Sequence, residues 1–229
     1  MAATHLLPLR PWRRRLLLPL PLPLRRPLAA LDGTALTLLR TSAVSALAAL
    51  ALARPAPRAT LVVLGAGALA PYLVAAHRSA HPSIDRVLLW NRSPHKAEAL
   101  VQRLRAGSGA GAAAVAFERA ESLDDAVAIG DIVSCATSSE TPLVKGKLLK
   151  PGAHLDLVGS GIGGGVRAGS HVAGRYRGTL IDLVGGRRGD AAAVVGRRSD
   201  DEITVFKSVG TAVVDILAAQ LAYETYINS

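Results

Sequence analysis

Small residues at a regular spacing follow a short apolar run near residue 60. The run at 61–64 is followed at once by Gly65, Ala66, Gly67, Ala68, Leu69 and Ala70. This G-x-G-x-x-A pattern lets a chain turn tightly after a strand, lets its backbone approach a pyrophosphate, and lets the next helix pack closely. The helix N-terminus would also offer unpaired N–H groups to the phosphates. The motif predicts a dinucleotide site formed by residues 65–69; the alternative is a tight turn without a ligand.

The triplet Asn91-Arg92-Ser93, after the next apolar run at 86–90, indicates which dinucleotide this is. A site that prefers NAD places Asp or Glu there to bond the ribose 2′-hydroxyl. A guanidinium instead pairs with a 2′-phosphate through two parallel hydrogen bonds, and Asn91 and Ser93 can add neutral ones. The triplet therefore favours NADPH over NADH. The alternative is an exposed arginine that only begins the next helix.

Strands and helices alternate around these motifs. The sequence predicts strands at 61–64, 86–90, 114–117, 131–136 and 154–159, and helices from the glycine turn to 79, at 94–105, at 122–129 and, as one turn, at 145–149. This alternation is typical of a parallel sheet covered on both faces, where continuous apolar strands are buried. We expect an α/β fold, a Rossmann-like doubly wound parallel sheet over residues 58–160, with parts of a second substrate and dimerisation domain.

The flanking segments differ in character from this region. Residues 1–30 form a Leu/Pro/Arg tail, which we expect to be disordered or extended because prolines exclude a regular helix. Residues 31–57 contain a predicted helix at 34–53, capped by Asp32 and ended by prolines. Residues 161–200 are Gly-rich, with one candidate regular element at 178–184. Residues 201–229 return as a predicted helix over 203–226.

Composition and charge limit the partners. The net charge is +10, but residues 1–28 hold six arginines and no acid, so the basic excess lies largely in the tail. Aromatic residues make up 3% of the chain, and the sequence shows no zinc-finger or RNA-recognition motif. We therefore expect no nucleic-acid partner. Uninterrupted apolar runs are shorter than the roughly 18 residues of a membrane span, so we expect a soluble protein without a membrane partner.

The compartment is indicated only weakly. The lone Cys135 excludes an internal disulfide, fits a reducing compartment, and is typical of a small core residue. The Arg-rich, acid-free tail favours a plastid leader, with a cytoplasmic protein as the alternative. A secretory signal and an unnatural N-terminus are two further interpretations of the tail.

Five segments together resemble the ornithine cyclodeaminase/mu-crystallin family, and above all its plant plastid branch, ketimine reductases that make pipecolate in systemic acquired resistance. They are LDGTALTLLRTSAVSALAA (31–49), VVLGAGALAPYLVAAH (62–77), DIVSCATSSETPLV (131–144), KPGAHLDLVGS (150–160) and DEITVFKSVGTAVVD (201–215). The resemblance covers about residues 29–160 and 178–226. It implies a homodimer that acts on a small imino acid with NADPH.

The resemblance also implies roles for single residues. Arg40 would hold the α-carboxylate of the substrate, for which a planar guanidinium is suited. The nicotinamide half of the cofactor would lie against Thr137 and the segment 155–158, with Leu157 and Val158 in contact. Ser208, Val209 and Gly210 would close the site from the C-terminal part of the chain. Without the resemblance, an ordinary surface arginine of a helix is the favoured interpretation of Arg40, and plain packing explains the other residues at least equally well.

Two departures from the family pattern separate the possible functions. Cyclodeaminases carry a catalytic Asp where this chain has Gly161, which disfavours an ornithine cyclodeaminase. The family's N-terminal segment supplies a second arginine and a lysine, and the Leu/Pro/Arg tail stands in its place, so no catalytic proton donor is assigned. Three hypotheses follow: a reductase of cyclic ketimine carboxylates, converting piperideine-2-carboxylate to pipecolate; a non-catalytic NADPH-binding protein like mu-crystallin; and a truncated product without a stable fold.

Overall fold

The computed structural model describes residues 15–19, 27–107, 115–139, 141–158, 179–181, 183 and 196–229, with side chains from residue 29 onward. The chain forms two compact units. The larger unit is Thr41–Gly210, and the smaller unit combines Met1–Arg40 with Thr211–Ser229. The division therefore falls inside the long helix α1 (Gly33–Leu52).

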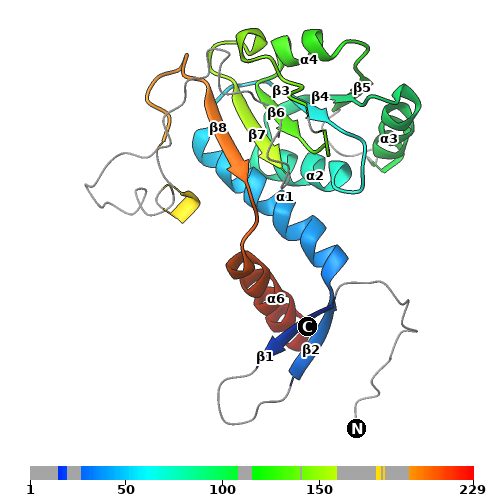
Figure 1. The fold of residues 1–229 in the computed structure, drawn as a ribbon, viewed down its shortest axis with the longest axis vertical. Helices are drawn as coiled ribbons and strands as arrows, with labels where there is room; N and C mark the ends of the chain where they lie inside the picture. The colour runs from blue at the N-terminus through cyan, green and yellow to red at the C-terminus, as the bar shows by residue number, and fades with distance from the viewer. Residues whose placement is uncertain are drawn as a thin grey trace. The chain divides into compact units, whose positions relative to one another are not determined.

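The larger unit is built on a six-stranded sheet in which every neighbouring pair of strands is parallel (Figure 1). Its strands are β3 (Ala59–Leu64), β4 (Ile84–Trp90), β5 (Ala116–Arg119), β6 (Ile132–Cys135), β7 (His154–Val158) and β8 (Thr204–Ser208). Their order across the sheet is β5-β4-β3-β6-β7-β8, the order of a doubly wound dinucleotide-binding fold. The structure therefore confirms the predicted Rossmann-like α/β class.

Helices connect these strands and cover both faces of the sheet. The connections in the larger unit contain α2 (Ala70–Ala80), α3 (Pro94–Gly107), α4 (Leu123–Ile129) and the short 3-10 helix η1 (Gly146–Leu148). Each lies within a few residues of its predicted place. The N-terminus of α4 is fixed by Ser122, whose hydroxyl accepts the amide of Asp125 at 3.3 Å, a common helix cap.

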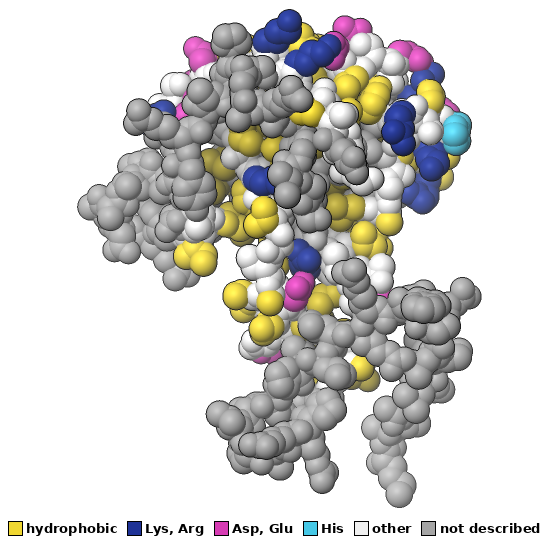
Figure 2. All heavy atoms as spheres, in the orientation of Figure 1, with side chains coloured by type: hydrophobic (Ala, Val, Ile, Leu, Met, Phe, Trp, Pro, Cys, Tyr) yellow, Lys and Arg dark blue, Asp and Glu magenta, His cyan; other side chains and the backbone are white. Residues whose placement is uncertain are grey.

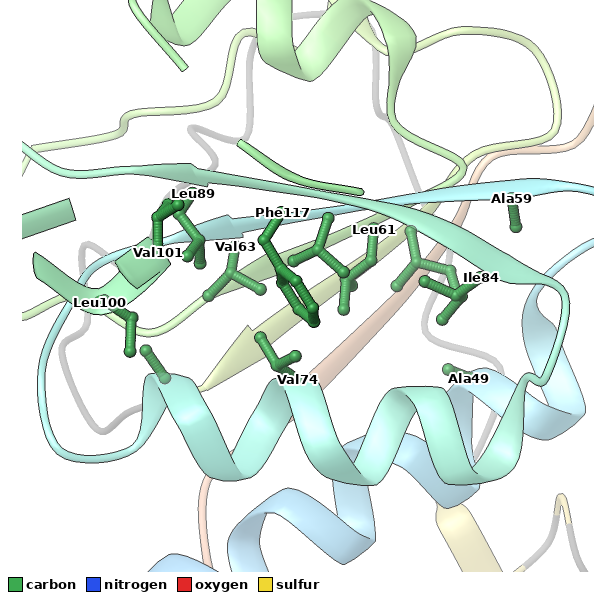
Figure 3. Close-up of a cluster of buried hydrophobic side chains, with 13 residues drawn as sticks. Ala49, Ala59, Leu61, Val63, Val74, Ile84, Leu89, Leu100, Val101 and Phe117 are labelled. Atoms are coloured by element: carbon green, nitrogen blue, oxygen red, sulfur yellow. The ribbon is translucent and has the colours of Figure 1, made fainter. Parts of the chain in front are cut away.

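One core lies between the sheet and helices α1, α2 and α3 (Figure 3). Leu61 and Val63 alternate along β3 and point to this face, where they meet Val74 of α2, Val101 of α3 and Ala49 of α1. All of these side chains are buried. Because burial of one such Val or Leu contributes about 1.5–3 kcal/mol, this core fixes the helices against the sheet.

A second core covers the opposite face of the same strands. The intervening residues of β3, Val62 and Leu64, pack there with Val127 of α4 and with Leu149, which follows η1. The two-residue period of a strand sends successive side chains to opposite faces. A strand with both sets apolar must be covered on both sides, as the sequence predicts for 61–64.

Helix α1 begins where the sequence predicts. Asp32 Oδ1 accepts the amide of Thr34 at 2.9 Å, which confirms the predicted cap. In the described part of the chain, α1 is the one helix long and apolar enough to span a membrane. The sequence did not indicate this helix as a possible span, because polar residues along it interrupt its apolar runs. Its second half nevertheless packs as a core element, since Ala48 and Ala49 are fully buried in the larger unit.

The strand β8 differs from the predicted helix over 203–226. Its residues pair with β7, from Thr204 opposite His154 to Ser208 opposite Val158. Helix α6 (Ala212–Ile227) begins only after Thr211, whose hydroxyl accepts the amide of Val214. The prediction is therefore wrong for the first residues of this segment. Pairing with the open edge of the sheet outweighs the local helical period.

The smaller unit holds β1 (Arg15–Pro19), β2 (Pro27–Asp32), the start of α1, and α6. Strands β1 and β2 pair in an antiparallel ribbon, where the sequence predicted a disordered or extended tail. Leu36 of α1 and Ala219 of α6 form its small core. Of the Gly-rich segment, residues 161–178 lie outside the described residues, while 180, 181 and 183 are helical within the candidate element at 178–184.

Candidate functional site

The glycine turn begins at the carboxyl end of β3. Gly65 has a φ of +115°, and a Cβ on it would lie 2.4 Å from the carbonyl oxygen of Ala136. Only glycine tolerates this backbone and this approach. The amide of Gly65 donates to the Trp90 carbonyl, and the amide of Ala136 donates to the Leu64 carbonyl, both at 2.8 Å. The turn is thus held between the ends of β3, β4 and β6, where open parallel sheets bind ligands.

The next residues leave room for a ligand above this turn. Gly67 is exposed, and a Cβ there would meet nothing within 4 Å. Ala70, the first residue of α2, is fully buried, as close packing of helix on strand requires. No side chain caps α2, and within the described ranges the amides of Ala68 and Leu69 have no hydrogen-bond partner. These features fit a pyrophosphate held by backbone N–H groups.

Asn91 has an internal role at the end of β4. Its Oδ1 accepts the amide of Ala66 at 3.2 Å, and its Nδ2 donates to the Ser93 carbonyl at 3.1 Å. It therefore ties the glycine turn to the neighbouring strand, and its contact with a cofactor phosphate stays a prediction. Arg92 is exposed, and among the described residues its guanidinium has no ion pair or hydrogen bond. Ser93 is half-buried just before α3.

Thr137 lies against the glycine turn from the next strand. Its Cγ2 is 3.3 Å from the position a Cβ would take on Gly65, and its Oγ1 accepts the amide of Ser139 at 3.2 Å. At the end of β7, Leu157 and Val158 are buried. Their side chains are therefore packing groups, and their contact with a cofactor stays a prediction.

The three residues predicted to close the site, Ser208, Val209 and Gly210, lie at the end of β8 and directly after it. Ser208 is buried and pairs in register with Val158. Val209 is 70% exposed, and Gly210, with a φ of +78°, is exposed just before α6. The structure therefore brings Ser208 next to β7, whereas Val209 and Gly210 form the link to the smaller unit.

Arg40 belongs to the smaller unit and has a partner that the sequence did not indicate. Its Nε lies 2.8 Å from Asp215 Oδ1 of α6, an ion pair without hydrogen-bond geometry. The two side chains are only 15% and 31% exposed. The one sequence feature that could have indicated this partner is Asp215 itself, a single acid within the apolar run 212–219. Asp215 holds the guanidinium in one place, which is the condition for a carboxylate-binding arginine.

Cys135 lies in an environment that disfavours a reactive thiolate. Burial raises the pKa of the Cys135 thiol, and the nearby Asp156 raises it further. The thiolate is the reactive form of cysteine. Cys135 is therefore the core residue that the sequence predicts. Among the described residues, no group of three or more His, Cys, Asp or Glu side chains is placed to hold a metal ion.

The sequence profile of the ornithine cyclodeaminase/mu-crystallin family matches residues 25–167 and 182–229. The chain belongs to the ornithine cyclodeaminase/mu-crystallin family. The matched stretches include the glycine turn, the end of β6, and both β8 and α6. The resemblance drawn from the sequence is therefore confirmed.

Members of the ornithine cyclodeaminase/mu-crystallin family and related structures cover most of this chain. Protein SAR DEFICIENT 4 of Arabidopsis thaliana is 42% identical over 231 residues, covering 88% of this chain and 68% of its own. A Delta(1)-pyrroline-2-carboxylate reductase of Colwellia psychrerythraea is 34% identical over 224 residues, covering 86% of this chain and 69% of its own. The solved Delta(1)-pyrroline-2-carboxylate reductase of Thermococcus litoralis, in complex with NADH and L-proline, superposes with a TM-score of 0.78 at 26% identity, covering 93% and 71%.

Proposed function

We propose that this protein is an NADPH-dependent reductase of cyclic ketimine carboxylates, of the kind that converts piperideine-2-carboxylate to pipecolate. Its relatives include reductases of a smaller cyclic imine of the same type, Delta(1)-pyrroline-2-carboxylate. The observation that carries the proposal is the turn at Gly65, which sits between the ends of β3 and β6 and carries open space above Gly67.

The residues of this chain have three tasks in the proposed reaction. Backbone amides after Gly65 hold the pyrophosphate, and Asn91 keeps those amides in place through Ala66. Arg40, oriented by Asp215, holds the carboxylate of the imine. When bound, the reduced nicotinamide supplies a hydride to the imine carbon, while the imine nitrogen takes up a proton.

Turnover by the purified chain tests this proposal. With piperideine-2-carboxylate present, we expect NADPH absorbance to fall and pipecolate to appear in equal amount by mass spectrometry. A folded protein that shows no turnover at millimolar imine would contradict the reductase. Quenching of the half-buried Trp90 by NADPH without turnover would instead select the non-catalytic, mu-crystallin-like alternative.

The preference for NADPH over NADH is expected to depend on Arg92. Its guanidinium is exposed and unpaired among the described side chains, and basic side chains show on the surface over the adjacent α3 (Figure 2). A charged hydrogen bond contributes about 1.5–3 kcal/mol, or roughly ten- to hundredfold in affinity. We therefore expect Arg92→Ala to weaken NADPH binding by that factor, measured by calorimetry, and to leave NADH binding within about twofold.

A matched variant controls for the loss of charge. Arg103 is an exposed arginine further along α3, so Arg103→Ala removes the same charge at a distance from the end of β4. It should leave the affinity for both nucleotides unchanged. Equal weakening of NADPH and NADH by Arg92→Ala, or a wild-type protein that binds NADH more tightly, would refute the assignment.

We also propose a homodimer, as the family resemblance implies. Helix α6 supports this, because most of its side chains are apolar while Ala219 alone among its residues is buried. Its exposed apolar side chains include Val213, Ile216, Leu217 and Leu221. Exposed apolar surface of this kind marks an interface. Sedimentation of the folded chain as a monomer at micromolar concentration would contradict the dimer.

A further inference from the structure

Polar side chains are buried on one face of the sheet, beside the apolar core of α1, α2 and α3. Asp156 and His154 of β7 and His77 of α2 are 0% exposed, and so is Ser45 of α1. His81, at the end of α2, has a buried Nε2. We refer to His77, His81, His154 and Asp156 as the buried imidazole cluster. All four belong to the larger unit.

Two short hydrogen-bonded chains enter this cluster from the sheet. In the first, Ser134 Oγ donates to Asp156 Oδ2 at 2.7 Å, and His77 Nε2 lies 3.5 Å from the same oxygen. In the second, His154 Nδ1 lies 2.9 Å from Thr204 Oγ1, and that hydroxyl donates to the carbonyl of Leu52 at 3.0 Å. The second chain thus reaches the last residue of α1.

Several atoms of the cluster have no hydrogen-bond partner among the described residues. They are both ring nitrogens of His77, the Nε2 atoms of His81 and His154, and Asp156 Oδ1. A buried polar atom without a partner costs about 1–3 kcal/mol. These atoms therefore lower the stability of the packing among α1, α2 and β7.

Helix α1 is held over this cluster by weak packing. The side chains it buries in the larger unit are small: Thr41, Ser42, Ser45, Ala46, Ala48 and Ala49. They offer little apolar area, and hydrophobic stabilisation is roughly proportional to area. Its C-terminal end is fixed through Leu52, whose carbonyl accepts Arg197 Nε at 2.9 Å as well as Thr204. Polar contacts at its end therefore add to this packing in holding the second half of α1 on the sheet.

We propose that the buried imidazole cluster makes the docking of α1 on the sheet pH-dependent. In the docked form, the imidazoles of His81 and His154 are neutral. Uptake of a proton by either of them detaches residues 41–52 from the sheet. The proposal does not depend on dinucleotide binding.

The electrostatic surroundings support neutral imidazoles in the docked form. Burial lowers the pKa of the His154 imidazole to about 3, although nearby Asp156 acts in the opposite direction. Burial and the neighbouring His77 lower the pKa of His81, while a backbone hydrogen bond with Ala49 of α1 opposes this.

The remaining charged groups near the cluster are few. Arg197 approaches it from the segment before β8, with Glu202 and Arg54 beside it. Lys207 of β8 and Cys135 of β6 lie on the opposite face of the sheet, since each is in register with Leu157 of the second core. The buried residues that α1 presents are uncharged. Among the described residues, Asp156 is therefore the one buried carboxylate near a proton taken up by His81 or His154.

The direction of the effect follows from these lowered pKa values. An exposed histidine titrates near pH 6.5, so the detached form binds protons below about that pH while the docked form does not. Each such imidazole shifts the equilibrium toward the detached form about tenfold per pH unit. For His154 this applies between about pH 6.5 and about pH 3.

Hydrogen exchange of the full chain tests the proposal. Between pH 7.5 and 5.5, after correction for intrinsic rates, we expect the opening constant of amides in 41–52 to rise about tenfold per pH unit below 6.5. Helix α3 of the same unit should keep its protection. Protection of 41–52 that is independent of pH would overturn the proposal, as would equal loss in α3.

Variants identify the groups that take up the proton. His154→Gln and His81→Gln should each reduce the pH dependence, whereas His95→Gln, an exposed histidine of α3, should not. If the cluster variants do not fold, the protonation state of each histidine can be followed in the wild-type protein through the 15N NMR chemical shifts of its imidazole ring. We expect His81 and His154 to be neutral at pH 7 and to gain charge together with the opening of α1. A charged His154 in protein with α1 still protected would refute the proposal.

Discussion

Gly65→Ala is expected to unfold the turn after β3 and to abolish dinucleotide binding. The new Cβ would meet the Ala136 carbonyl at 2.4 Å, and an L-residue is strained at a φ of +115°. Backbone strain alone costs about 1–3 kcal/mol, and displacement of a strand end adds to it. We expect a loss of about 3 kcal/mol or more in the free energy of unfolding, measured by urea denaturation.

Gly67→Ala is the matched variant with the opposite expectation for stability. A Cβ on Gly67 meets nothing within 4 Å, and its backbone does not require glycine. The unfolding free energy should therefore stay within about 0.5 kcal/mol of the wild type. NADPH affinity should nevertheless fall roughly tenfold or more, because the methyl group occupies the space through which a pyrophosphate approaches the backbone. Unchanged NADPH affinity in folded Gly67→Ala would show that the cofactor does not bind at this turn.

The sequence was sufficient for the elements that depend on local pattern. The apolar run at 61–64 with Gly65 behind it predicts a buried strand and a tight turn, because few other arrangements suit that composition. Asp32 stands before residues with helical apolar spacing and predicts the start of α1, because a carboxylate there can accept a free amide of the first turn. The order of the strands across the sheet depends on long-range pairing and was not predicted beyond its parallel class.

Contacts between distant residues account for what the sequence did not indicate. Asn91 is predicted to bind the cofactor from its position, and the sequence did not indicate that its side chain also ties Ala66 to the end of β4. Residues 204–208 looked helical, but the exposed edge of β7 determines their conformation. Both outcomes depend on which segment happens to be adjacent in space, and a one-dimensional pattern does not contain that information.

One signal for the buried imidazole cluster was present in the sequence. In the segment His154-Leu155-Asp156-Leu157, polar and apolar residues alternate, and such alternation normally marks a strand with one solvated face. Here the same strand lies inside a sheet covered on both sides, so its polar face is buried against α2. The conflict between an alternating pattern and an interior strand marks a position where a local rule is broken, as happens at strained or functional sites.

Asp156→Ala is therefore expected to be among the most destabilising substitutions in this chain. It removes the acceptor of Ser134 Oγ and the partner of His77, both of which are 0% exposed. A buried polar group left without a partner costs about 1–3 kcal/mol, and this variant leaves the Ser134 hydroxyl and the His77 ring in that position. We expect a loss of that size in urea denaturation at pH 7, if the variant remains folded enough to be measured.

Asp156→Asn separates the hydrogen bond to Ser134 from the contact with His77. The amide oxygen can still accept from Ser134, but the carboxylate that lies 3.5 Å from His77 Nε2 is replaced by a neutral amide. If the contact with His77 stabilises the fold, Asp156→Asn should lose about 2 kcal/mol or more, and combining it with His77→Gln should cost less than the sum of the two. A loss below about 1 kcal/mol with additive effects would mean that the contact between Asp156 and His77 contributes little. The stability of this part of the sheet would then depend on the hydrogen bond from Ser134 and not on the approach of His77.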